Sequence, residues 1–251
     1  MSTAKSKSIR AMKARGEQIA ALTAYDYPMT KLLDDAGIPL ILVGDSLGMV
    51  VLGYSDTTQV TMDEIEHHLK ACARAKPRAL LVADMPFGTY ENPETALKNA
   101  QRLVMSGAEA VKAEGGREIL EQVRAIVGAE IPFLGHLGML PQHVREEGGY
   151  HIKGKTDIER ENLLADAVAL EKAGAFAVVL ELVKPAVTKE VTEKISIPTI
   201  GIGAGTDCDG QILVTTDLLG TSPDYIPKHV KLKFNLAEQM RAAFAEWKST
   251  L

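Results

Sequence analysis

The sequence predicts a single-domain (β/α)8 barrel that spans residues 1–251, and two features of its hydrophobic pattern support this prediction. Eight apolar runs are spread along the chain, and most are continuous rather than alternating, as in strands that are buried on both faces. Amphipathic segments with helical spacing separate these runs, and successive strand and helix units with right-handed crossovers build a parallel sheet. The expected strands lie near residues 19–24, 40–44, 79–84, 110–114, 132–136, 177–182, 198–202 and 210–215.

A doubly wound open sheet is the competing fold. Its dinucleotide-binding members carry a GxGxxG pattern between the first strand and the helix that follows. None of the expected strands is followed by this pattern, so the sequence favours the barrel.

Several helix boundaries can be located in the sequence. Thr61 with Glu64 forms a capping-box pattern, and Asn92 followed by Pro93 supplies a cap and a proline at the first helical position. Asp26 stands just before another helix and is expected to cap it or to pair with a basic side chain. Three helices are expected to end on a glycine in the left-handed conformation, at Gly37, Gly107 and Gly174.

The two ends of the chain lead to separate expectations. Residues 1–16 are basic and lack the apolar core of a secretory signal, so we expect a short solvated leader, with a transit peptide as the alternative. The last amphipathic segment carries apolar residues at helical spacing, and we expect it to form the helix that closes the barrel. These apolar residues are Leu236, Met240, Ala243, Phe244 and Trp247.

The composition excludes several classes of protein. A net charge of -5 argues against a nucleic-acid partner, since such proteins usually carry a basic face. No apolar run approaches the roughly 20 residues of a membrane span. Cys72 and Cys208 fit neither a disulfide framework nor a metal-binding spacing, so we expect a protein of the reducing cytoplasm.

Acidic side chains recur where the apolar runs end. Asp45, Asp84, Glu114 and Glu181 each follow or finish an expected strand, and His136 does the same. In a barrel of parallel strands the active site lies at the C-terminal mouth, where residues from several strand ends converge. The sequence therefore predicts that these five side chains are neighbours in space.

Crowded carboxylates repel one another, and burial penalises each charge further, so a cation is expected among them. An oxygen-only set without cysteine favours a hard ion, Mg²⁺ before Mn²⁺. The alternative is that each acid caps a helix or pairs with a basic side chain, as isolated strand-end acids usually do. Four acids in corresponding places favour the metal or substrate site.

Two further residues have more than one interpretation. Lys112 lies two residues before Glu114 and so leaves the strand on the same inward face. It is expected to contact an anionic substrate, or alternatively to act as a Schiff-base nucleophile. His136, between glycines, is either a packed or hydrogen-bonded histidine or a catalytic one, while His68 falls on a helical face and is expected to pack there.

Two glycine-rich segments follow late strands. Residues 200–210 carry glycines at alternate positions, which is typical of a phosphate-binding loop but also of a strand that another backbone approaches closely. Residues 146–155 are polar and glycine-rich, and they form either a mobile lid or an ordinary surface loop.

These segments together resemble the 3-methyl-2-oxobutanoate hydroxymethyltransferase (ketopantoate hydroxymethyltransferase) family, in order and spacing, from about residue 20 to about residue 235. The resemblance implies a (β/α)8 barrel that makes 2-dehydropantoate from 3-methyl-2-oxobutanoate and 5,10-methylenetetrahydrofolate, on the route to pantothenate. It also implies a homo-oligomer, often a decamer in that family. The matching motifs are "TAYDYP", "LVGDSLGMVVLGY", "VADMPFGTY", "AVKAEGG", "GHLGMLPQ", "GGYHIKGK", "VLELV" and "IPTIGIGAGTDCDGQILV".

The resemblance also implies roles for individual residues. Asp45, Asp84 and Glu114 occupy the positions that hold Mg²⁺, directly or through water. Glu181 falls at the position of the proton acceptor. The residues implied to contact or approach the oxo acid are Asp45, Ser46, Asp84, Lys112 and His136.

The chain departs from the family pattern after Glu181, where Leu182, Val183 and Lys184 stand before Pro185. Residues 219–234 also differ from the family, so the contacts to folate are not implied. A Schiff-base aldolase that uses Lys112 is one alternative function, and two others remain open. One is a Mg²⁺-dependent oxo-acid lyase of the phosphoenolpyruvate and pyruvate barrel group, and the other is a non-catalytic barrel that binds an oxo acid.

Overall fold

Eight parallel strands pair in sequence order and close on themselves, with β8 beside β1, in the computed structural model. The structure describes residues 4–222, 226–228, 230 and 234–251. Each strand lies within two residues of its expected position at either end, so the predicted (β/α)8 barrel is confirmed. The strands are β1 (Ile19–Thr23), β2 (Leu40–Val43), β3 (Leu80–Asp84), β4 (Ala110–Glu114), β5 (Phe133–Gly138), β6 (Ala177–Glu181), β7 (Thr199–Ile202) and β8 (Gly210–Leu213).

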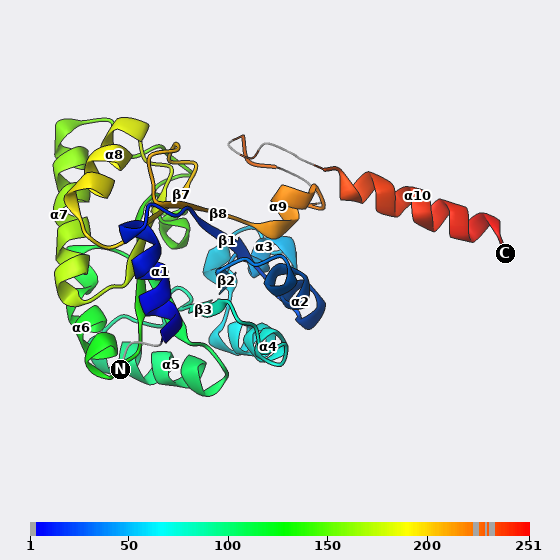
Figure 1. Cartoon of the computed structure of the whole chain (residues 1–251), viewed down its shortest axis with the longest axis horizontal. Helices are drawn as coiled ribbons and strands as arrows, with labels where there is room; N and C mark the ends of the chain where they lie inside the picture. The colour runs from blue at the N-terminus through cyan, green and yellow to red at the C-terminus, as the bar shows by residue number, and fades with distance from the viewer. Residues whose placement is uncertain (1–3, 223–225, 229, 231–233) are drawn as a thin grey trace.

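Helices connect the strands from β1 to β7, a loop joins β7 to β8, and the helices other than α10 lie around the barrel (Figure 1). The α-helices are α1 (Ala4–Ala14), α2 (Tyr27–Asp35), α3 (Leu47–Val50), α4 (Met62–Ala73), α5 (Pro93–Met105), α6 (Leu120–Gly128), α7 (Asp157–Ala173), α8 (Pro185–Lys194), α9 (Thr215–Leu219) and α10 (Leu236–Ser249). The short 3-10 helices are η1 (Thr57–Gln59), η2 (Arg117–Ile119) and η3 (Pro141–His143). No α-helix in the described part of the chain is both long enough and apolar enough to cross a membrane.

The expected helix boundaries are confirmed. Thr61 and Glu64 form a full capping box at α4, and the side chains of Asp26 and Asn92 accept backbone hydrogen bonds at the starts of α2 and α5. Gly174 ends α7 in the left-handed conformation with φ of 99°, where a side chain would be strained. Gly37 and Gly107 also have positive φ.

The apolar strand residues divide by parity into two cores. Leu40 and Leu42 of β2 belong to the cluster inside the barrel, whereas Ile41 and Val43 belong to the larger cluster between the strands and the helices. Since side chains alternate along a strand, the same parity decides which polar residues point inward.

Helix α1 covers the N-terminal end of the barrel. Ile9 is buried in the interior cluster, although we expected this segment to be a solvated leader. Lys5 donates to the carbonyl oxygens of Pro77 and Ala79, and Lys13 donates to carbonyl oxygens around α8 and lies 3.0 Å from Asp209. Lys5 and Lys13 therefore attach a packed helix to the barrel, and the segment is not a solvated leader.

Helix α10 forms where the sequence predicts a helix, but it does not close the barrel. It extends away from the other helices (Figure 1), and none of its residues is buried. Met240, Phe244 and Trp247 stay exposed. Helical periodicity predicted the helix correctly, while the surface that its apolar residues contact is not encoded in that periodicity.

Candidate active site

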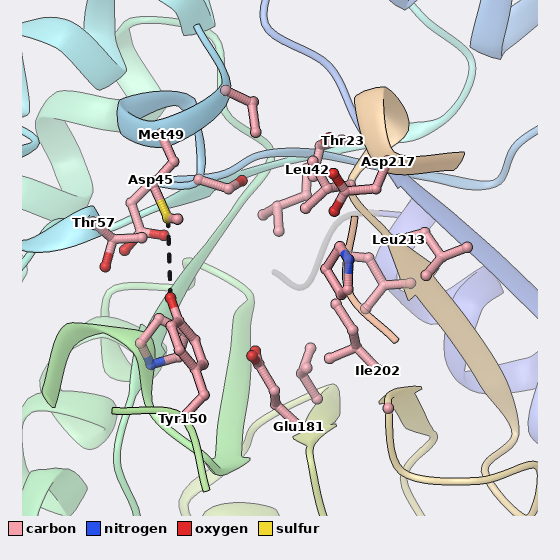
Figure 2. Close-up of a pocket in the computed structure, with 18 of the residues that line it drawn as sticks. Thr23, Leu42, Asp45, Met49, Thr57, Tyr150, Glu181, Ile202, Leu213 and Asp217 are labelled. Carbon is pink, nitrogen blue, oxygen red and sulfur yellow. Dashed lines mark hydrogen bonds between the residues drawn. The ribbon is translucent and has the colours of Figure 1, made fainter. Parts of the chain in front are cut away.

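A cavity of about 1030 Å³ opens at the C-terminal mouth of the barrel (Figure 2). Because Asp84, Lys112, Glu114, His136 and Glu181 share the inward parity of their strands, their side chains converge on it. The loop after β2 contributes two more lining residues. All of the predicted site residues line this cavity, namely Asp45, Ser46, Asp84, Lys112, Glu114, His136 and Glu181.

Asp84 and Lys112 form a buried ion pair at the centre of the site. They are register partners on β3 and β4, and Nζ of Lys112 lies 2.6 Å from Oδ1 of Asp84. The other oxygen of Asp84 accepts a hydrogen bond of 2.9 Å from the backbone N–H of Asp45. One carboxylate thus fixes both the lysine and the start of the loop after β2.

Gln142, which the sequence reasoning missed, joins two of the predicted acids. Its side-chain amide donates to Oδ2 of Asp45 at 2.8 Å and to the carbonyl of Met85 at 3.0 Å. Its backbone N–H donates to Oε2 of Glu114 at 2.9 Å, and its amide oxygen accepts from the hydroxyl of Tyr90 at 2.5 Å. With two acceptors on one side and a hydroxyl on the other, the orientation of the amide is fixed.

A second missed residue, Tyr25, supports Ser46. The two hydroxyl groups are 2.8 Å apart, and Tyr25 is buried beyond the end of β1. The backbone carbonyl of Tyr25 is 2.7 Å from Nδ1 of His68, so His68 is hydrogen-bonded within the packing, as expected. Tyr25 and Gln142 each follow closely on a strand end, and this position was the available signal.

Asp45, Asp84 and Glu114 form a group that we call the carboxylate cluster, and burial and mutual repulsion change the pKa of two of its members, Asp45 and Glu114. Burial, followed by the charge of Asp84, raises the pKa of Asp45 to about 7. Burial, followed by the charge of Asp45, raises the pKa of Glu114 well above its ordinary value. Burial alone would lower the pKa of Lys112, but the neighbouring carboxylates outweigh it and raise that pKa.

The protonation of Lys112 bears on its two predicted roles. A Schiff-base nucleophile needs a neutral amine, usually obtained by a lowered pKa. Its raised pKa and its pairing with Asp84 keep this lysine charged, which favours electrostatic contact with an anionic substrate.

His136 lies between two carboxylates. Its Nδ1 is 3.5 Å from Oε1 of Glu114, and its Nε2 is 3.3 Å from Oε2 of Glu181. Among the described residues neither nitrogen has a hydrogen-bond partner, and neither does Oε1 of Glu114, although all three atoms are buried. Burial, followed by the charge of Lys112, lowers the pKa of His136, so its ring is neutral. Unpartnered buried atoms of this kind mark a place where a ligand or water belongs.

The donor set suits a hard cation. Among the described residues, no three His, Cys, Asp or Glu side chains stand together in an arrangement that would hold a metal ion by themselves. The carboxylate cluster nevertheless offers only oxygen donors, and its three carboxyl groups lie beside a single cation, Lys112. Oε1 of Glu114 also has no hydrogen-bond partner in the part of the chain that the structure describes. A divalent ion that takes one or two carboxylates, with its remaining ligands from water and substrate, matches these observations.

The glycine-rich segment at residues 146–155 covers one side of the cavity. Tyr150 and Ile152 line the cavity, and the hydroxyl of Tyr150 lies 4.0 Å from the sulfur of Met49 (Figure 2). The backbone of Lys153 donates to the carbonyl of Leu182, directly after Glu181. Leu182 has φ of 47°, a conformation that is costly for a leucine and is typical of functional sites. Leu182, the first residue at which the sequence departs from the family pattern, therefore has a strained backbone.

The fold and the site together define a (β/α)8 barrel with an acidic cavity at its C-terminal mouth. The family model of ketopantoate hydroxymethyltransferase matches residues 3–251. A 3-methyl-2-oxobutanoate hydroxymethyltransferase from Ignicoccus hospitalis is 54% identical over 92% of this chain and 89% of its own length. Another, from Moorella thermoacetica, is 53% identical over 96% of this chain and 90% of its own. The chain belongs to the ketopantoate hydroxymethyltransferase family.

Solved structures share the fold at low sequence identity. A phosphonopyruvate hydrolase in complex with oxalate and Mg²⁺ aligns with a TM-score of 0.66 at 14% identity, over 99% of this chain and 88% of that one. A 2,3-dimethylmalate lyase of the PEP mutase/isocitrate lyase superfamily aligns with a TM-score of 0.62 at 16% identity, over 99% and 86% of the two chains. These likenesses confirm the barrel fold.

Proposed function

We propose that this chain transfers a hydroxymethyl group from 5,10-methylenetetrahydrofolate to 3-methyl-2-oxobutanoate and so makes 2-dehydropantoate for pantothenate synthesis. The observation that carries the proposal is the convergence of Asp45, Asp84, Lys112, Glu114 and Glu181 on one cavity in a member of this family. The reaction needs a base to remove a proton from C3 of the oxo acid, and positive charge to stabilise the resulting anion.

Asp45 and Asp84 would hold Mg²⁺, and Glu114 would hold it directly or through water. When bound, the ion supplies positive charge to the 2-oxo and carboxylate oxygens of the substrate. Lys112 adds a second, fixed positive charge on the same side, and Ser46 offers a hydroxyl that Tyr25 keeps in place. These groups bind and orient the oxo acid.

Glu181 is the base in this proposal. It ends β6 on the inward face, and its side chain is 13% exposed, so it reaches the cavity while remaining shielded from bulk water. Glu181 takes the C3 proton, and C3 then forms a bond to the one-carbon unit of the folate. Water supplies the hydroxyl oxygen of the product as both N–C bonds of that unit break, and tetrahydrofolate leaves. His136 lies beside Glu181 and, being neutral, adds no further charge to balance.

The proposal also covers the cellular compartment and the oligomeric state of the enzyme. Two buried cysteines without a disulfide partner suit a reducing cytoplasm. The exposed apolar residues of α10 support a homo-oligomer, since monomers rarely expose several large apolar side chains together.

The test is an assay of 2-dehydropantoate formation from the two substrates, with and without a chelator. The proposal expects conversion that excess EDTA abolishes and added Mg²⁺ restores. An oxo-acid lyase would consume a different substrate and form no 2-dehydropantoate, and a non-catalytic barrel would show no turnover.

A further inference from the structure

Two hydroxyl groups in the cavity have no strong hydrogen-bond partner. Thr57 is only 3% exposed, and no described residue forms a hydrogen bond with its Oγ1. In the part of the chain that the structure describes, the only partner of the Tyr150 hydroxyl is the sulfur of Met49, 4.0 Å away. A thioether is a weak acceptor. Because both residues line the cavity, both hydroxyls are available to a ligand there.

The two hydroxyls lie on the side of the cavity that holds Asp45. Thr57 and Met49 lie near Asp45, and the side chain of Tyr150 points toward this group (Figure 2). Although Tyr150 is 47% exposed as a whole, its hydroxyl end faces the cavity. Burial, followed by the charges of Glu181 and Asp45, raises the pKa of Tyr150, so the hydroxyl keeps its proton and can donate it in a hydrogen bond.

An ion pair joins the two loops that carry these hydroxyls. Nε of Arg145, in the segment before Tyr150, lies 2.8 Å from Oδ2 of Asp56, which directly precedes Thr57. The side chain of Asp56 also caps η1, because it accepts a hydrogen bond of 3.0 Å from the backbone N–H of Thr58. Two segments that are distant in the sequence therefore meet at the mouth of the barrel.

The backbone beyond Tyr150 is fixed next to Glu181. The N–H of Lys153 donates to the carbonyl of Leu182 at 2.8 Å, and the carbonyl of Lys153 accepts from the N–H of Lys184 at 3.0 Å. Leu182 directly follows Glu181 at the end of β6. The segment that carries Tyr150 is therefore anchored on the strand end that carries the proposed base.

The anion of the oxo acid accepts hydrogen bonds but donates none. Its carboxylate and its 2-oxo group present only acceptor oxygens, which the ionised members of the carboxylate cluster repel. Lys112 already pairs with Asp84, and Ser46 shares a hydrogen bond with Tyr25. Two hydroxyls without strong partners, on the same side as Asp45, supply further donors that such a ligand needs.

We propose that Tyr150 and Thr57 donate hydrogen bonds from their hydroxyl groups to the oxygens of the bound oxo acid. This inference rests on the proposed function, from which it takes the substrate. It adds two binding residues that come from loops instead of strand ends.

The decisive variants are Tyr150→Phe and Thr57→Val, which each remove one hydroxyl and keep nearly the shape of the side chain. With Mg²⁺ present and without folate, calorimetry should show that each variant binds 3-methyl-2-oxobutanoate about 3- to 10-fold more weakly, the usual contribution of one uncharged hydrogen bond. The melting temperature should change little, because neither hydroxyl has a strong partner within the described residues.

Steady-state kinetics separate the two substrates. KM for the oxo acid should rise by a similar factor in each variant, while KM for methylenetetrahydrofolate should stay within about twofold. A role in the general packing of the cavity would change both values together.

Matched controls lie outside the cavity lining. Tyr27→Phe makes the same change at a tyrosine of nearly equal exposure, 48%. Thr188→Val makes the same change at a buried threonine of α8 whose hydroxyl also has no partner among the described residues. Both controls should leave oxo-acid binding unchanged.

Several results would overturn the inference. Unchanged affinity in one variant would remove that residue from the oxo-acid site, and unchanged affinity in both would overturn the inference while leaving the proposed function intact. A higher KM for the folate alone would also overturn it, because the hydroxyls would then contact the second substrate. If the unaltered protein forms no 2-dehydropantoate from the two substrates, the proposed function fails and the inference fails with it.

Discussion

Nζ of Lys112 lies 2.6 Å from Oδ1 of Asp84, and the two residues are register partners on adjacent strands. Both side chains are at most 5% exposed. Replacing one member of such a buried ion pair strongly destabilises the fold, because the other charge is left buried without a partner. The pair therefore holds the positive charge of Lys112 at the place where the oxo acid is expected to bind.

Replacing Lys112 by alanine should raise KM for the oxo acid at least roughly tenfold, the factor that corresponds to about 1.4 kcal/mol of lost attraction. KM for the folate should change less, since only the oxo acid is expected near this charge. Steady-state kinetics with each substrate varied in turn would measure both values. Lys98→Ala, at an exposed lysine of α5, is the control. Equal effects on the two substrates would indicate a general structural role instead.

Asp84→Asn should weaken Mg²⁺ binding at least roughly tenfold, because one of the proposed ligands loses its charge. Isothermal titration calorimetry measures the binding, and circular dichroism checks that the barrel persists. Asp35→Asn, at an exposed acid at the end of α2, should leave Mg²⁺ binding as it is. Full activity of the unaltered enzyme in excess EDTA would argue against any metal at this site.

Glu181→Gln should slow the exchange of the C3 hydrogen in heavy water by roughly 10²- to 10⁴-fold, the usual contribution of a positioned base. The amide has nearly the size of the carboxylate but cannot accept the proton. Proton NMR of 3-methyl-2-oxobutanoate would follow the loss of the C3 signal without any folate present. Binding of the oxo acid should change little, and exchange at the unaltered rate would exclude Glu181 as the base.

Gln142→Leu should lower kcat and Mg²⁺ affinity by roughly 10- to 100-fold, although Gln142 is expected to touch neither substrate. The leucine removes the donor to Asp45 and leaves Oδ2 of that acid without this partner. Tyr90→Phe is the matched control, since it removes only the hydroxyl that orients the amide, and its effect should be several-fold smaller. A loss of thermal stability with normal Mg²⁺ affinity would instead assign Gln142 to packing alone.

Glu66 allows a test of pH dependence away from the active site. Hydrogen bonds from Lys70, Ser106 and Arg102, in that order, lower its pKa from 4.5 to about 2. A carboxylate whose pKa is lower in the folded state stabilises the fold above the unfolded pKa, and this stabilisation is lost as pH falls toward the folded pKa. Glu66→Gln should therefore cost about 1 kcal/mol at pH 7, after allowance for solvent screening.

This cost should shrink between pH 4.5 and about pH 2, the interval between the two pKa values. Urea unfolding at pH 7 and at pH 3 would show whether the difference between the variant and the unaltered protein narrows. Glu91→Gln, at an exposed loop residue, should show almost no difference at either pH. A constant difference at both pH values would mean that Glu66 acts through packing rather than charge.

The barrel could be predicted from the sequence because the signal for each strand is local. A continuous apolar run such as residues 80–84 indicates a buried strand, and the polar residue that ends it points to the mouth. Parity then placed Lys112 and Glu114 on the same inward face, as the structure has them.

Other parts of the site depend on contacts between distant segments. Gln142 and Asp45 are 97 residues apart, and nothing in the spacing of either predicts their hydrogen bond. Thr215 and Thr23 are likewise 192 residues apart, and the hydrogen bonds between them join the start of α9 to the end of β1. The same limit applies to α10, since a periodic pattern identifies a helix but not the surface that it contacts.

Lys5 and Lys13 fasten α1 to the N-terminal end of the barrel, while every proposed reacting group lies at the opposite end. The contacts that hold the ends of the strands together and the contacts that choose a substrate are therefore carried by different residues. For protein engineering, this means that a library can vary only the loops at the C-terminal mouth of the barrel. Variants that bind other branched oxo acids can then be selected while the stabilising contacts of α1 stay unchanged. Acceptance of new substrates and tolerance to heat can be selected in this barrel as independent traits.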